Sequence, residues 1–304
     1  MRAFALFVGL FVLAGVAAAC VAYPAYELTS TFAPWAFHRV AGRIAMLILA
    51  LELVWFCRLE GLTRKPDFGF GLPWRRFMAQ ALVWGVIGMA TAAGGAAFLL
   101  GTQLRLPATD APSIPHLLAL GLSSGIAVAL LEETVMRGAM HTAIQRESGP
   151  WAAALLTAPL FAVTHFFAKV RIPPEELHWQ SGFDLLTRSF APLAHLSLVL
   201  DSFLAWLAVG LVLSLTRVLT GNIAVAIGLH AGWVVVLRML QESTVRNAAA
   251  SPYDGWVGRF DGILGYWLLP WALAIGGALW LTRAVWVPYA KGTIGANGAR
   301  ASSR

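Results

Sequence analysis

Long apolar runs recur along this chain, and each is close to the length that a helix needs to cross a membrane. About 20 helical residues cross roughly 30 Å of hydrocarbon. Lipid also requires each spanning segment to satisfy its own backbone hydrogen bonds, and none of these runs shows the period-two alternation of a barrel strand. We therefore predict an all-α, polytopic transmembrane helical bundle of about eight spans. The runs are Phe4–Tyr23, His38–Cys57, Phe77–Leu100, Leu117–Met140, Trp151–Ala168, Pro192–Leu219, Asn222–Leu240 and Ile263–Leu281.

Composition supports a membrane location and excludes the ordinary soluble classes. The chain is 59% hydrophobic and 12% charged, with a mean hydropathy of +0.71. These values lie far outside the range of a soluble globular domain. The net charge of +7 does not indicate a nucleic-acid partner, because the basic residues are scattered among loops and form no single stripe. Anionic lipid headgroups are the expected partners of these residues.

The loop between the second and third runs carries the densest basic charge. Short cytoplasmic loops are biased toward Lys and Arg, so we place this loop and both chain termini in the cytoplasm. The bias is modest, because another basic loop, around Arg171, falls outside on an eight-span count. The basic residues of the first loop are Arg58, Arg64, Lys65, Arg75 and Arg76.

The first run has a second interpretation as a cleaved signal peptide or lipoprotein signal. Arg2 precedes it, and small residues end at Cys20. We favour an uncleaved span, because the run is long for a signal and an even span count agrees with the charge bias. Cys20 and Cys57 would then lie at opposite membrane faces, too far apart for a disulfide. Two cysteines also form no metal motif.

The loops are short and no repeat is visible, so the expected organisation is a single membrane domain over residues 1–304. We predict a disordered tail over residues 289–304, which is rich in Gly, Ala and Ser. The longest polar loop runs from Lys169 to Phe190. We expect a plain connector there, and the alternatives are a lid or an interfacial helix.

Two adjacent carboxylates lie deep in the fourth apolar run, in the sequence LLEETVMRGAM. Ionisable groups at such a depth are costly to insert and are therefore functional candidates. Glu133 and Arg137 have the i, i+4 spacing at which a carboxylate and a guanidinium meet on one helix face. Glu132 points about 100° away around the helix. It is left without an obvious counter-charge, which suits a general acid or base.

Two histidines in later runs can reach this level. His165 lies four residues after Phe161, on the same helix face. Glu132 and His165 are equally distant from the turn at Gly149, so in an antiparallel pair of helices they lie at equal depth. His230 is nine residues past the turn at Gly221, about 11 Å short of that depth. The difference closes if the fourth and fifth helices project from the membrane by about two turns.

These three sequences, in this order, resemble the motifs EExxxR, FxxxH and HxxxN of the CAAX-protease and bacteriocin-processing (CPBP) family of intramembrane glutamic or metallo-endopeptidases. The first motif matches fully and the second matches at Phe161 and His165. The third matches only at His230, because Val234 stands where the family has Asn. The resemblance covers roughly Leu117 to Leu240, which would be the catalytic core.

The resemblance implies hydrolysis of a peptide bond in a membrane-associated protein or peptide. Glu132 and His165 would hold and activate the attacking water, and His230 would stabilise the developing oxyanion. Glu133, Arg137 and Phe161 would support these groups. Val234 puts the oxyanion contact in question, since the family's Asn would share that task.

The requirement for a cofactor is left open by the residues. Glu132, His165 and His230 are acceptable ligands for a divalent metal such as Zn²⁺, which would acidify a bound water. A glutamate-activated water without metal suits the same residues, and we favour it slightly. The expected location is the bacterial inner (cytoplasmic) membrane.

Other hypotheses account for the same residues. The polar groups could form interhelical hydrogen bonds that fix packing. They could relay protons in a proton-coupled transporter, although no inverted repeat is visible. A family member that has lost hydrolysis could act as a membrane scaffold, as Val234 would allow. The remaining intramembrane polar residues are expected to serve packing: Arg43, Glu52, His195, Asp201 and Arg238.

Overall fold

The computed structural model describes residues 1–33, 35–167, 170–247 and 252–284. The chain divides into two compact units, the first made of Met1–Thr63 and Val163–Val199 and the second of Arg64–Ala162 and Leu200–Arg304. Each unit is described by itself. The prediction of one membrane domain over residues 1–304 concerns how the two units pack together, and it stays a prediction. The predicted tail at residues 289–304 lies outside the described residues.

The predicted all-α membrane architecture is confirmed. Among the described residues, six helices are long and apolar enough to span a membrane, and the two shorter apolar helices are Pro150–Thr164 and Leu268–Leu281. Together they correspond in order to the eight predicted runs. The last helix is shorter than its run, because residues 263–267 form turns. The chain is therefore an integral membrane protein surrounded by lipid.

The first unit is built from helices α1 and α2 and the amphipathic helix α7. α1 and α7 approach closely at Gly182, where an added Cβ would lie 2.0 Å from the carbonyl oxygen of Ala19. The Lys169–Phe190 loop, expected as a plain connector, therefore contains helical structure, and the prediction of a connector was wrong. Lys169 itself lies outside the described residues. The elements are α1 (Arg2–Ser30), α2 (Phe37–Leu59), η3 (Pro174–Glu176) and α7 (Ser181–Ala194).

The second unit contains the remaining elements. Helices α6 (Pro150–Thr164) and α8 (Leu196–Thr220) lie mostly in this unit. The others are η1 (Lys65–Phe68), α3 (Trp74–Gly101), β1 (Arg105–Pro107), α4 (Ile114–Glu133), η2 (Thr134–Met140), α5 (His141–Ser148), α9 (Ala224–Ser243), β2 (Thr244–Arg246), η4 (Asp254–Trp256) and α10 (Leu268–Leu281).

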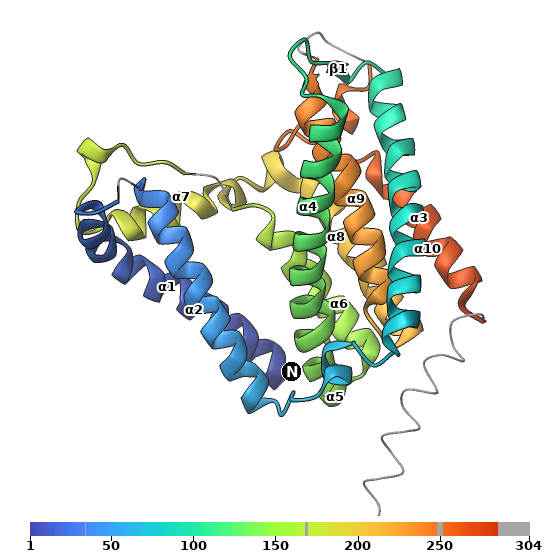
Figure 1. The fold of residues 1–304 in the computed structure, drawn as a ribbon, viewed down its shortest axis with the longest axis horizontal. Helices are drawn as coiled ribbons and strands as arrows, with labels where there is room; N and C mark the ends of the chain where they lie inside the picture. The colour runs from blue at the N-terminus through green and yellow to red at the C-terminus, as the bar shows by residue number, and fades with distance from the viewer. Residues whose placement is uncertain (34, 168–169, 248–251, 285–304) are drawn as a thin grey trace, which may run out of the picture. The chain divides into compact units, whose positions relative to one another are not determined.

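Helix α9 is the centre of the second unit, and α3 and α4 pack along it (Figure 1). Glycines make this close packing possible, as is common between membrane helices. A Cβ at Gly88 of α3 would lie 2.6 Å from the carbonyl oxygen of Leu229, and one at Gly125 of α4 would lie 2.7 Å from that of Ala231. Leu229 and Ala231 flank His230 in α9. The two glycines therefore let the backbones of α3 and α4 approach α9 on either side of this histidine.

The fourth predicted run is one continuous helical rod that changes its winding. α4 ends at Glu133, η2 continues as a π-helix over Thr134–Met140, and α5 runs to Ser148. The wider π turn includes Arg137 and begins directly after the two carboxylates. A π segment inside an α-helix is uncommon and frequently occurs at functional sites.

A small cap covers the far end of α3 and α9. Strand β1 pairs antiparallel with β2 in the register Arg105↔Arg246. The buried side chain of Arg105 donates to the carbonyl oxygens of Thr244 (2.6 Å) and Gly262 (3.3 Å). Arg105 therefore ties the strand pair to the segment that leads into α10.

Candidate functional site

A buried ion pair forms the base of the candidate site. Arg137 Nη1 donates to Glu133 Oε1 at 3.1 Å, and both side chains are 0% exposed. The predicted i, i+4 pairing is confirmed, and it persists although Arg137 lies in the π-helix. Arg137 Nη2 also donates to the carbonyl oxygen of Gly210 in α8 at 3.0 Å. A carboxylate and a carbonyl thus hold the buried guanidinium, while Arg137 Nε and Glu133 Oε2 are buried without a hydrogen-bond partner.

His230 joins this pair from helix α9. Its Nδ1 lies 2.8 Å from Glu133 Oε1, and the side chain is 4% exposed. A carboxylate beside a guanidinium accepts hydrogen bonds only, so Nδ1 of His230 is the donor. In the neutral imidazole the free lone pair then lies on Nε2. The carboxylate that contacts His230 is Glu133, and it links His230 to Arg137.

Phe161 of α6 contacts both partners of Glu133. The Arg137 guanidinium carbon lies 4.4 Å from the centroid of the Phe161 ring, in cation–π geometry. The His230 ring packs against the same ring edge to face, with centroids 5.9 Å apart. Phe161 is fully buried and fills the space between the arginine and the histidine. These contacts join four motif residues in a closed ring: Glu133, Arg137, Phe161 and His230.

Glu132 lies beside these four residues and takes no part in the hydrogen bonds that join Glu133 to Arg137 and His230. It is half-buried, and its Oε2 is a buried oxygen with no hydrogen-bond partner. It is close enough to His230, Glu133 and Arg137 to interact with their charges. Its carboxylate is therefore available to a water or a substrate, which agrees with the predicted division between the two glutamates.

His165 belongs to the first unit, which resumes at Val163. It follows the last residue of α6, Thr164. The structure thus gathers the other predicted residues within the second unit, and His165 is not part of that set. The predicted meeting of His165 with Glu132 stays a prediction.

The depth argument holds for His230. Arg217 donates to the carbonyl oxygen of Gly221 and also to Thr142 Oγ1 at 3.2 Å. The turn at Gly221 therefore lies level with the start of α5, and the rod continues beyond it to Ser148, nearly two turns further. This extension beyond the level of Gly221 offsets the unequal distances of Glu133 and His230 from their turns, and the projection of the helices from the membrane stays a prediction.

The sequence did not identify three groups that the structure places at this site. Gly210 supplies a carbonyl, Trp206 packs on Phe161 with ring centroids 6.0 Å apart, and Arg217 holds the backbone of the π-helix. Arg217 is only 6% exposed. Its position at the end of an apolar run, in LSLTRVLT, was the available signal.

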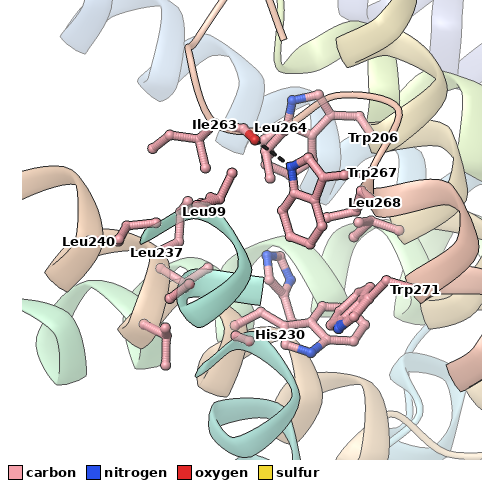
Figure 2. Close-up of a pocket in the computed structure, with 16 residues that line it drawn as sticks. Leu99, Trp206, His230, Leu237, Leu240, Ile263, Leu264, Trp267, Leu268 and Trp271 are labelled. Carbon is pink, nitrogen blue, oxygen red and sulfur yellow. Dashed lines mark hydrogen bonds between the residues drawn. The ribbon is translucent and has the colours of Figure 1, made fainter. Parts of the chain in front are cut away.

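An apolar cavity of about 70 Å³ adjoins His230 on the side of the cap. Figure 2 shows the His230 ring directed among the lining side chains, with indole rings on one side and leucines on the other. Trp233 and Trp271 donate their indole N–H groups to Thr91, and Trp267 donates to Ile263. These indoles therefore offer ring surface to an occupant and no free N–H donor.

Val234 lies in the wall of this cavity, one helical turn from His230. Asn in its place would add an amide beside the histidine. Val instead extends the apolar surface, so the lining presents His230 as its titratable group.

The donor set for a metal is incomplete within the part of the chain that the structure describes. A catalytic zinc usually has three protein ligands. No group of three or more His, Cys, Asp or Glu side chains in the described ranges could hold an ion. Metal binding by Glu132, His165 and His230 stays a prediction.

Comparison with known proteins identifies the region that contains this site. Residues 114–236 match the family model described as "Type II CAAX prenyl endopeptidase Rce1-like". No curated protein and no solved structure matches the chain. The matched range includes every residue of the three motifs. The resemblance to the CPBP family of intramembrane proteases is therefore confirmed, as a similarity to CAAX proteases over residues 114–236.

Proposed function

We propose that this protein is an intramembrane endopeptidase that hydrolyses a peptide bond in a membrane-associated protein or peptide. One observation supports this most strongly. His230 is oriented by the buried pair Glu133–Arg137 at the end of an apolar cavity, and a second carboxylate, Glu132, stands beside it without a hydrogen-bonded partner for Oε2. A fixed imidazole and an available carboxylate suit general acid–base chemistry.

In the proposed reaction Glu132 and His165 hold the attacking water. The Glu132 carboxylate accepts a proton from the water as its oxygen bonds to the substrate carbonyl carbon. Glu132 then returns that proton to the leaving amine as the peptide C–N bond breaks. His230 meets the oxyanion through Nε2, because its Nδ1 is turned toward Glu133. Nε2 donates to the oxyanion in the imidazolium form, in which both ring nitrogens carry a proton.

The apolar cavity favours a substrate with an apolar group beside the scissile bond. The matched family model is named for prenyl endopeptidases, and a prenylated peptide is therefore the first substrate class to test. Its isoprenoid chain needs apolar surface and no hydrogen bonds. The ring faces of Trp267 and Trp271 provide that surface next to His230.

The test is cleavage of a fluorogenic peptide with a farnesylated cysteine near its carboxyl end, by purified protein in lipid nanodiscs. We expect Glu132→Gln, His165→Ala and His230→Ala each to lower kcat by about a hundredfold or more, the usual range for acid–base and oxyanion groups. Because these groups act as a unit, a double variant should be little worse than the worse single variant.

Matched controls come from exposed residues of the same types. Glu176→Gln and His178→Ala change side chains outside the described site, and both should keep wild-type rates. Wild-type cleavage by Glu132→Gln would contradict the protease proposal. Proton-coupled uptake by proteoliposomes would then support the transporter hypothesis.

A scaffold without hydrolytic activity is a second candidate, and Val234 favours it. The cavity wall at this position offers no amide to an oxyanion. A scaffold would bind the farnesylated peptide and leave it uncut, with the same affinity in wild-type protein and in Glu132→Gln.

A further inference from the structure

The π-helix η2 is packed between two other elements of the second unit. On one side a Cβ added to Gly138 would lie 2.7 Å from the carbonyl oxygen of Phe68 in η1. On another side α8 makes hydrogen bonds to Arg137. A π turn is less favourable than an α turn. Some of its backbone N–H and C=O groups must form hydrogen bonds with groups outside the helix. Its geometry therefore depends on these neighbours.

Helix α8 holds Arg137 at two points. Gly210 accepts from the Arg137 guanidinium at 3.0 Å, and Arg217 Nε donates to the Arg137 backbone carbonyl at 3.0 Å. Gly210 and Arg217 are seven residues apart, which places them on one face of α8. The side chain and the backbone of Arg137 are thus fixed by the same helix.

The Arg217 guanidinium joins three parts of the chain. Besides the Arg137 carbonyl, it donates to the Gly221 carbonyl at the end of its own helix and to Thr142 Oγ1 in α5. All three acceptors are neutral oxygens. The planar guanidinium fixes the direction of several donors at once, which a lysine ammonium cannot do.

We propose that Arg217 is a positioning residue for the candidate site: by holding the Arg137 carbonyl it sets the π-helix, and through Arg137 and Glu133 it fixes the orientation of His230. The connection is continuous. Arg217 bonds Arg137, Arg137 bonds Glu133 Oε1, and the same oxygen receives His230 Nδ1 at 2.8 Å. Arg217 is not among the residues that line the cavity, and its hydrogen bonds go to Arg137, Thr142 and Gly221. This inference rests on the proposed function only where activity is measured.

The decisive variant is Arg217→Lys, which keeps the positive charge and loses the guanidinium fork. In the farnesylated-peptide assay we expect kcat to fall about tenfold, the effect of losing one hydrogen bond to a charged group. KM should stay within about twofold, because Arg217 does not line the cavity. A purely structural residue would lower the yield of folded protein and leave kcat per folded molecule unchanged.

The orientation of His230 provides a readout that needs no substrate. ¹⁵N NMR of histidine-labelled protein in nanodiscs distinguishes the two imidazole tautomers, and the His230 signals are assigned by their loss in His230→Gln. Wild-type protein should show one tautomer, protonated at Nδ1. Arg217→Lys should show a mixture, because Glu133 is no longer held in one position.

Two further variants complete the test. Arg238→Lys changes an arginine of α9 that pairs with Glu242 at the surface, and it should match wild type in both readouts. Thr142→Val removes one of the Arg217 hydrogen bonds. It should lower kcat about threefold, less than Arg217→Lys, because the hydrogen bond from Arg217 to the Arg137 carbonyl is kept.

Wild-type kcat and a single His230 tautomer in Arg217→Lys would overturn the proposal. If that variant gives no folded protein, the same two results in Thr142→Val would overturn it. If wild-type protein does not cleave the peptide, the proposed function fails with this substrate, and the tautomer measurement alone decides the role of Arg217.

Discussion

At the residue scale, the two adjacent glutamates occupy different environments. Glu133 accepts from Arg137 and contacts His230 through Oε1, whereas Glu132 takes part in neither contact; Oε2 of each carboxylate is buried without a hydrogen-bond partner. Adjacent positions on a helix point about 100° apart. One carboxylate is therefore directed into the polar contacts between helices, and the other is left for chemistry.

This difference predicts that Glu→Gln substitution changes the free energy of unfolding far more at position 133 than at position 132. Glu133→Gln removes the counter-charge of a fully buried arginine and should destabilise the protein by about 3–5 kcal/mol. Glu132→Gln should leave the free energy of unfolding within about 1 kcal/mol of wild type, because no hydrogen bond to Oε2 is lost. Denaturation of both variants in mixed micelles measures these energies. Equal destabilisation would mean that both carboxylates are structural.

Val234 provides a second prediction at this scale. Val234→Asn places an amide one turn from His230 in the cavity wall. We expect peptidase activity to stay unchanged or to rise, by up to about tenfold if the amide donates to the oxyanion. Val234→Leu, which stays apolar, is the control. Loss of activity in the Asn variant alone would indicate a pocket organised around an apolar residue, and the family's oxyanion role would not transfer to His230.

At the element scale, the segment that closes the cap is organised by one carboxylate. Asp261 Oδ1 accepts the backbone N–H groups of Ile263 and Leu264, both at 2.8 Å. Burial, with a smaller effect from the nearby Asp201 carboxylate, raises the pKa of Asp261 to about 6, although these two N–H groups and Arg105 oppose the change. Ile263 and Leu264 line the cavity, so Asp261 supports one of its walls.

The raised pKa predicts a pH dependence of stability. The folded protein binds the Asp261 proton more tightly than the unfolded chain, whose pKa is near 3.8. The stabilisation is fully present below pH 3.8 and is lost as the pH rises through about 6. Thermal unfolding between pH 5 and pH 7.5 should show a decrease of about 1.4 kcal/mol in the free energy of unfolding at the higher pH.

Asp261→Asn should remove most of that dependence, because the amide is neutral and its oxygen can accept the same two N–H groups. The matched control is Asp254→Asn, which changes a carboxylate that is 51% exposed and pairs with Arg246. A pH slope that persists in Asp261→Asn would show that another group carries it.

At the scale of the whole molecule, the orientation in the membrane follows from the basic loop between α2 and α3. Helix α3 separates this loop from the cap, so its two ends should face opposite sides. We expect a cytoplasmic loop, and cytoplasmic termini with it. The tail after Lys291 lies outside the described residues, and its side is a prediction of the sequence.

Labelling of single cysteines tests this orientation. In a background with Cys20 and Cys57 replaced, Arg75→Cys should react with an impermeant maleimide only from the cytoplasmic side. Asp110→Cys, beyond the other end of α3, should react only from the opposite side, and both positions are exposed. A cysteine in the tail after Lys291 should behave like Arg75→Cys. Labelling of the loop and the tail from opposite sides would contradict an even number of spans.

The sequence by itself determined the features that depend on short-range periodicity and solvent. Apolar runs of helical length predicted the membrane helices, since lipid admits few alternatives. The Glu133–Arg137 pair was predictable because i, i+4 neighbours meet on any helix. The order of the three motifs indicated the protease family. None of these inferences requires knowledge of which helices are neighbours.

Only the tertiary structure decided which groups meet across helices. Glu133 contacts His230 across 97 positions, and Arg217 reaches the Arg137 carbonyl across 80 positions. Side-chain direction at such contacts depends on helix rotation, on glycines that bring backbones together, and on the wider winding of η2. These features arise from packing over the whole unit, which is why the local pattern did not indicate that the fold buries Arg217 beside the candidate site.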